Sequence, residues 1–96
     1  MKTLVLKDLV QDSSSNNQGT VLFDYLKKAK SSGEPILLEV SSDLALSSSF
    51  LNSSIGMFLE EYGINSFRET IKFKGSKNQF TRLSKYIQTY SELYLA

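Results

Sequence analysis

The sequence predicts a single α/β domain: a small, mostly parallel sheet packed by helices, in the order β-α-β-α-β-α. Short apolar runs alternate with stretches of helical periodicity, and this alternation favours parallel strands with right-handed crossovers. The run at 35–40 is almost continuously apolar, as in a strand covered on both faces. Neither a repeat nor a change in composition divides the 96 residues, so we expect one domain over 1–96.

The first half of the chain predicts two strands joined by a helix. Thr3–Lys7 is the first strand, and the polar, turn-rich residues 11–19 predict a loop. Residues 20–30 place apolar side chains on one helical face, and Gly33 predicts the left-handed end of that helix. Pro35–Val40 is the second strand, which we expect at the centre of the sheet.

The second half predicts a helix, a strand and a last helix. The loop Ser41–Ser49 leads into a helix over 49–62, where apolar residues recur every three or four positions until Gly63. Phe67–Gly75 alternates and predicts a strand with one solvated face. Ser76 is the expected N-cap of the last helix. The apolar stripe of that helix consists of Phe80, Leu83, Tyr86, Ile87, Tyr90, Leu93 and Tyr94.

The composition excludes several classes of site. There is no cysteine and no histidine, which removes disulfides, thiolate chemistry and the commonest metal ligands, so we expect no metal and no cofactor. The net charge of +1 offers no strong field for nucleic acid. The first apolar run is interrupted by Lys7 and Asp8, and no stretch has the ~18–20 apolar residues of a membrane span, so we expect a cytoplasmic protein.

The remaining charged residues and glycines predict no active site. Glu60 and Glu61 are adjacent on a helix and therefore point in different directions, and no carboxylate has a base or nucleophile at a recognisable spacing. We therefore expect no enzyme. Gly56, inside the second helix, predicts close packing or, alternatively, a docking partner. Five basic residues could suggest a nucleic-acid surface: Lys72, Lys74, Lys77, Arg82 and Lys85. The aromatic residues near them fit the core stripe of the last helix and the net charge is near zero, so we expect no nucleic-acid binding.

The serine triplet at the start of the second helix is the candidate site. In an open α/β sheet, functional loops lie at the carboxyl ends of strands, and Ser47, Ser48 and Ser49 follow the expected central strand. The first turn of a helix has free N–H groups that stabilise an anion, including a phosphate on a serine. The simpler interpretation is that one serine caps the helix and the other two are loop residues.

The strand ILLEV, followed by a loop and by SSSFLNSSIGMFLEEYG, resembles the STAS-like family of small bacterial proteins, which is named for its similarity to the sulfate-transporter and anti-sigma-factor-antagonist domain. Those domains carry an acidic residue on the strand and then DSSGL. The matching places Glu39 on the strand acid, Ser47 on the aspartate, Ser48 and Ser49 on the serine pair, and Phe50 on the glycine. Ser47 and Phe50 therefore depart from the family pattern.

The resemblance, which spans residues 22–90, implies a STAS-like regulatory and protein-interaction module. In anti-sigma-factor antagonists, a kinase phosphorylates the second serine of the pair, which implies Ser49, and then Ser48, as phosphoacceptors. The implied partner is a histidine-kinase-like ATPase. A homodimer through the last helix, and binding of a small anion or ligand at the helix start, are the alternatives. The expected partner surface comprises Ser41, Ser42, Asp43, Ser47, Ser48, Ser49, Asn52 and Ser53.

Overall fold

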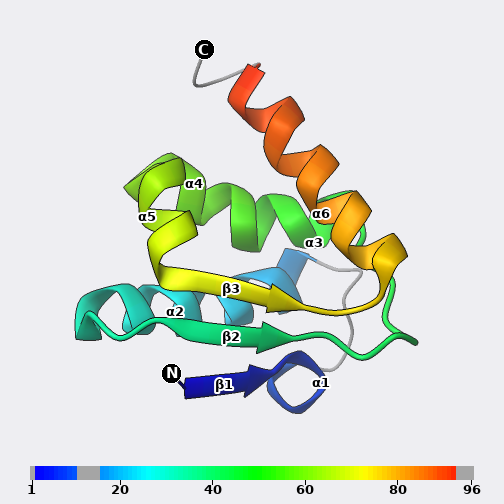
Figure 1. Cartoon of the computed structure of the whole chain (residues 1–96), viewed down its shortest axis with the longest axis horizontal. Helices are drawn as coiled ribbons and strands as arrows, with labels where there is room; N and C mark the ends of the chain where they lie inside the picture. The colour runs from blue at the N-terminus through cyan, green and yellow to red at the C-terminus, as the bar shows by residue number, and fades with distance from the viewer. Residues whose placement is uncertain (1, 11–15, 93–96) are drawn as a thin grey trace.

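The protein is an α/β domain built on a three-stranded parallel sheet in the order β1-β2-β3 (Figure 1). This computed structural model describes residues 2–10 and 16–92. The elements are β1 (Lys2–Val5), α1 (Leu6–Leu9), α2 (Asn16–Ser32), β2 (Ile36–Glu39), α3 (Ser48–Leu51), the π-helical segment η1 (Asn52–Gly56), α4 (Met57–Tyr62), α5 (Ile64–Thr70), β3 (Ile71–Lys74) and α6 (Lys77–Tyr90). The predicted parallel sheet and the central place of the second strand are confirmed.

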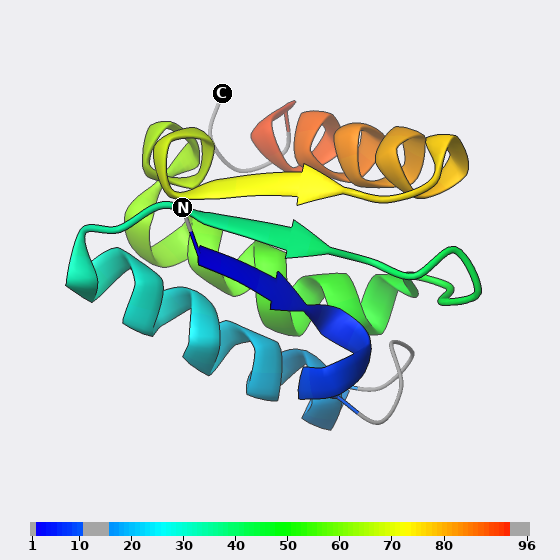
Figure 2. The same ribbon diagram turned by 60° about the horizontal axis from the view of Figure 1, so that its bottom comes forward.

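Helices cover one face of the sheet. Figure 2 shows α2 and the α3–α4 helix on the same side of the sheet. This arrangement follows because both crossovers are right-handed and both advance in the same direction, from β1 to β2 and from β2 to β3. The predicted covering of the second strand on both faces is therefore wrong. On the open face, Leu37 lies between Thr3 and Lys72, and Leu37 remains half-buried.

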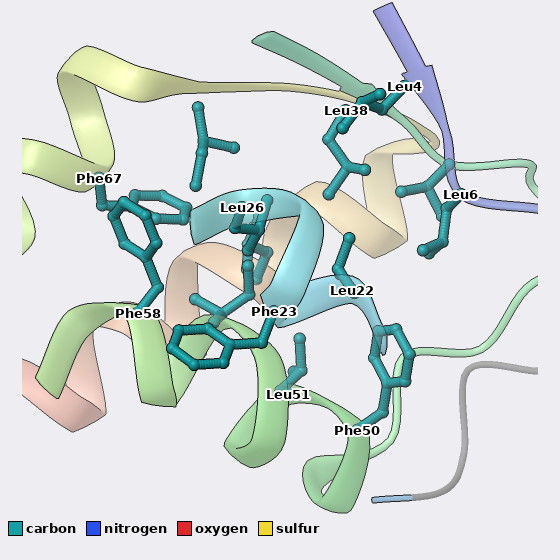
Figure 3. Packing of buried hydrophobic residues seen from close by; sticks show 14 of the residues in the cluster. Leu4, Leu6, Leu22, Phe23, Leu26, Leu38, Phe50, Leu51, Phe58 and Phe67 are labelled. Carbon is teal, nitrogen blue, oxygen red and sulfur yellow. The ribbon is translucent and has the colours of Figure 1, made fainter. Parts of the chain in front are cut away.

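The hydrophobic core lies between the sheet and the helices (Figure 3). Leu38 of β2 faces Leu22 and Leu26 of α2, and Phe58 of α4 is completely buried. The expected stripe of the last helix is only partly confirmed: Leu83 is 5% exposed, whereas Phe80 is 55% exposed. Phe80 was expected in the core, but α6 lies beside β3 rather than under the middle of the sheet, so only one side of α6 reaches the core (Figures 1 and 2). Leu93 and Tyr94 lie outside the described residues.

The beginning of the chain differs from the prediction at two boundaries. The first strand ends at Val5, and Leu6–Leu9 form a short helix instead of continuing the strand. Residues 16–19 were expected in a loop but form the first turn of α2, while 11–15 lie outside the described residues. Tertiary packing accounts for the longer helix, since Gly19 is buried against the chain at Phe50.

The third strand is shorter than its sequence pattern predicts. Phe67–Thr70 belong to α5, and only Ile71–Lys74 pair with β2. The helical turn buries Phe67 and Thr70, which are three positions apart, and the Phe67 ring centroid is 6.1 Å from that of Phe58. The alternation of apolar and polar residues over 67–75 therefore has two causes. Residues 67–70 have a buried helical face, and Ile71–Lys74 form a strand that is buried on one face and exposed on the other.

The central helix is continuous from Ser48 to Tyr62 but changes its hydrogen-bonding pattern at η1. Within η1, the hydroxyl of Ser54 donates to the carbonyl oxygen of Phe50 at 2.7 Å. Such back-bonding competes with the backbone ladder and accompanies local widening of a helix. Gly56 is buried, and a Cβ there would lie 2.5 Å from the Tyr86 hydroxyl. This contact supports the close-packing interpretation of Gly56.

Candidate functional site

The three serines at the start of α3 occupy different positions in the helix. Ser47 is the N-cap, because its hydroxyl accepts a hydrogen bond from the Phe50 N–H at 3.1 Å. Ser48 and Ser49 occupy the first turn, and both are exposed. The expectation that one serine caps the helix is confirmed for Ser47. The two phosphoacceptor candidates are thus accessible, and neither provides the cap.

The loop before α3 is fastened to α6 through its backbone. Gln79 donates from Nε2 to the carbonyl oxygens of Ser41 and Leu44, both at 2.7 Å. The same side chain closes the capping box of α6 with Ser76, which confirms the predicted N-cap. Arg82 donates from Nε to the carbonyl oxygen of Leu46. Satisfying these carbonyl groups fixes the path by which the chain enters α3.

A hollow of about 410 Å³ lies between the start of α3 and α6. Arg82 reaches Ser48 from across this hollow, with 3.4 Å between Nη2 and the serine Oγ. Lys85 lines the same hollow, one helical turn further along α6. Two cations and the amino-terminal end of a helix therefore give this part of the surface a local preference for negative charge. The lining comprises Ser48, Leu51, Asn78, Thr81, Arg82, Lys85, Tyr86 and Thr89.

The expected partner surface is divided between different neighbours. Asn52 is exposed and accepts a hydrogen bond from the Tyr86 hydroxyl at 2.6 Å, so it lies on the α6 side. Ser53 is half-buried on the α2 side, where it approaches Gly19. Asp43 forms a surface ion pair with Lys7 at 3.5 Å. Such an exposed pair contributes little stability, about 0–1 kcal/mol.

Arg82 and Lys85 line the candidate site, but sequence reasoning did not place them there. Their spacing of three positions places them on one face of α6, but it does not reveal which neighbour that face meets. In the sequence they stand among basic residues that could only suggest a nucleic-acid surface. Their relation to Ser48 depends on the packing of α6 beside α3, which brings together residues 34 positions apart.

Within the part of the chain that the structure describes, no three carboxylate side chains gather as metal ligands would. Among the same residues, no helix combines the length and apolar character that crossing a bilayer requires.

The chain is similar to a family of known proteins. The model of a family described as a STAS-like domain of unknown function matches residues 18–80. The matched region runs from α2 into the first turn of α6, and it includes Ser48 and Ser49 but not Arg82 or Lys85. No curated protein and no solved structure matches the chain.

Proposed function

Because the chain belongs to the STAS-like domain family, we propose that it is a non-catalytic regulatory module that binds a protein partner at the start of α3. Phosphorylation of Ser49, and secondarily of Ser48, switches this binding. The partner is a histidine-kinase-like ATPase. The observation that carries the proposal is the exposure of both serines on a helix start that is capped by Ser47.

Modification of the first turn is compatible with the fold. A phosphate on Ser48 or Ser49 would add about 1.5–2 negative charges at the end of the helix where anions are stabilised. The helix keeps its cap, since the Ser47 hydroxyl is already bonded to the Phe50 N–H. The free energy of unfolding is therefore expected to stay nearly constant while a neutral side chain facing the partner becomes negatively charged.

The two candidate serines differ in their surroundings, and this favours different roles. A phosphate on Ser48 would meet Arg82 and Lys85 within the hollow, where charge-assisted hydrogen bonds would hold it against the protein. Ser49 is not among the residues that line the hollow. A phosphate on Ser49 would therefore remain available to repel an acidic or apolar partner surface, which makes Ser49 the better switch.

The switch is tested by mass spectrometry of the protein from its native cell, together with pull-downs of wild type and Ser49→Asp. We expect a phosphate on Ser49 or Ser48 and a partner whose affinity falls at least tenfold with Ser49→Asp. Ser31→Asp, which places the same charge on the exposed face of α2, is the matched control and should retain the partner. Absence of phosphate, combined with identical partners for all three proteins, would contradict the proposal.

The hollow beside Ser48 favours a second candidate function, the binding of a small anion. Thermal melting against inorganic phosphate, nucleotides and fatty acids would detect it. A ligand at ten times its Kd raises the free energy of unfolding by about 1.4 kcal/mol. We expect Ser48→Ala or Lys85→Gln, at two residues that line the hollow, to reduce the resulting rise in Tm. A Tm that no anion raises would exclude this function and leave the switch unaffected.

A further inference from the structure

A second and larger hollow lies on the other side of α6. Its volume is about 850 Å³, and it separates α6 from α5 and β3. We call it the β3 groove, and it is lined by Ile64, Phe67, Arg68, Ile71, Lys72, Phe73, Phe80, Leu83, Ser84, Ile87, Gln88, Ser91 and Glu92. None of these residues lines the hollow beside Ser48. The β3 groove is therefore a separate surface.

The β3 groove runs along the free edge of the sheet. β3 is the last strand of the sheet and pairs with β2 on one side only (Figure 1). The carbonyl oxygen of Lys74 accepts from the Val40 N–H at 2.8 Å, so the backbone groups of Lys74 face inward. Backbone groups of successive residues in a strand point to opposite edges, so the N–H and C=O of Phe73 face the groove. An extended chain could pair with them.

The floor of the β3 groove exposes apolar surface. Phe80 is 55% exposed, and its ring centroid lies 6.2 Å from that of the half-buried Phe73. Ile87 follows on the same side of α6, two turns beyond Phe80. The buried Oγ of Ser91 at the end of this row has no hydrogen-bond partner among the described residues. An apolar floor beside a strand edge accommodates alternate side chains of an added strand.

The charges around the edge select the chemistry of the added strand. Lys72 and Lys74 are exposed on the open face of the sheet, and Arg68 lines the groove near them. In a strand laid against β3, every second side chain would lie beside these lysines, and opposite charges across a strand pair are stabilising. A second copy of β3 would place lysines against lysines, which disfavours self-association through this edge.

We propose that the β3 groove binds an extended segment of a protein partner in which apolar and acidic side chains alternate. The segment adds a fourth strand to the sheet through the backbone of Phe73. Its apolar side chains cover Phe80 and Ile87, and its acidic side chains face Lys72 and Lys74. This proposal does not depend on the switch at Ser49, because the two surfaces share no residue.

The test uses the full chain and an acetylated, amidated heptapeptide that carries fluorescein and alternates valine with aspartate. Fluorescence anisotropy at protein concentrations up to about 1 mM detects Kd values to that range. We expect at least tenfold tighter binding of this peptide than of one with lysine in place of aspartate. A third peptide carries N-methyl groups at alternate residues, on the edge that would pair with Phe73. This peptide should not bind.

Variants at exposed positions keep the test independent of folding. The double variant Lys72→Glu/Lys74→Glu should weaken binding of the acidic peptide at least tenfold and reverse the charge preference. Phe80→Ser should weaken it about fivefold, whereas Lys27→Glu, at an exposed position of α2, should leave the Kd unchanged. Failure of the acidic peptide to bind would overturn the proposal, since edge lysines would then serve only to prevent aggregation. Equal binding of both peptides, or dimerisation through β3 in sedimentation, would overturn it as well.

Discussion

Phe58→Ala is expected to lower the free energy of unfolding by about 3–5 kcal/mol, the loss typical of truncating a fully buried phenylalanine. The Phe58 side chain is 0% exposed, and its ring centroid lies 4.9 Å from that of Tyr62 and 6.1 Å from that of Phe67. Domains of this size are commonly stable by about 5–15 kcal/mol, so the variant should retain only part of its stability. Urea denaturation followed by circular dichroism measures the loss.

Phe80→Ala is the matched control for this prediction, because the sequence places both phenylalanines on apolar helical stripes. Phe80 is 55% exposed, and its truncation should lower the free energy of unfolding by less than about 1 kcal/mol. Equal losses in the two variants would contradict the observed position of α6. They would show that its outer side packs in the core, as the stripe by itself suggests.

Gly19→Ala is expected to destabilise the protein by up to about 2 kcal/mol, although alanine is the better helix former. An alanine Cβ at this position would lie 2.6 Å from the carbonyl oxygen of Phe50 and would also collide with Oγ of Ser53. Overpacking of a tight contact costs about 1–3 kcal/mol, which exceeds the gain of up to about 1 kcal/mol in helix propensity. Thermal and urea unfolding provide the measurement.

Two further variants separate packing from propensity in this experiment. Ser31→Ala lies on an exposed part of α2 and should leave stability unchanged or raise it slightly. In a Ser53→Ala background, the cost of Gly19→Ala should decrease but not vanish, since the Phe50 carbonyl remains in place. A stabilising Gly19→Ala in the wild-type background would refute the close approach of α2 to the central helix.

Local chemistry allowed much of the fold to be predicted. Alternation of apolar runs with helical periodicity correctly predicted parallel strands, with the 35–40 run at the centre. Gly33 and Gly63 end their helices with positive φ values of 74° and 88°, a conformation that favours glycine. Ser76 caps its helix with Gln79, three residues later. The two glycine ends and the Ser76 cap depend on neighbours within about four residues, so they are readable from sequence.

The likeness to a STAS-like domain was also readable, and the family match over residues 18–80 confirms it. That likeness rests on the residues ILLEV and SSSFLNSSIGMFLEEYG, which resemble the family motif and lie close together in the chain. The exposure of Ser48 and Ser49 could not be predicted from this stretch. It depends on what the rest of the chain leaves uncovered, and the structure provides it.

Tertiary structure alone decided which face of each element is buried and which other elements it contacts. The sheet is covered on one side because successive crossovers advance in one direction, and no strand pattern records that direction. Packing made Phe67–Thr70 helical and placed Arg82 beside Ser48. Sequence therefore determined the elements and their caps, whose hydrogen bonds are local. Only the fold determined the hollow beside Ser48 and the β3 groove, because the packing of α6 against other elements leaves no periodicity along the chain.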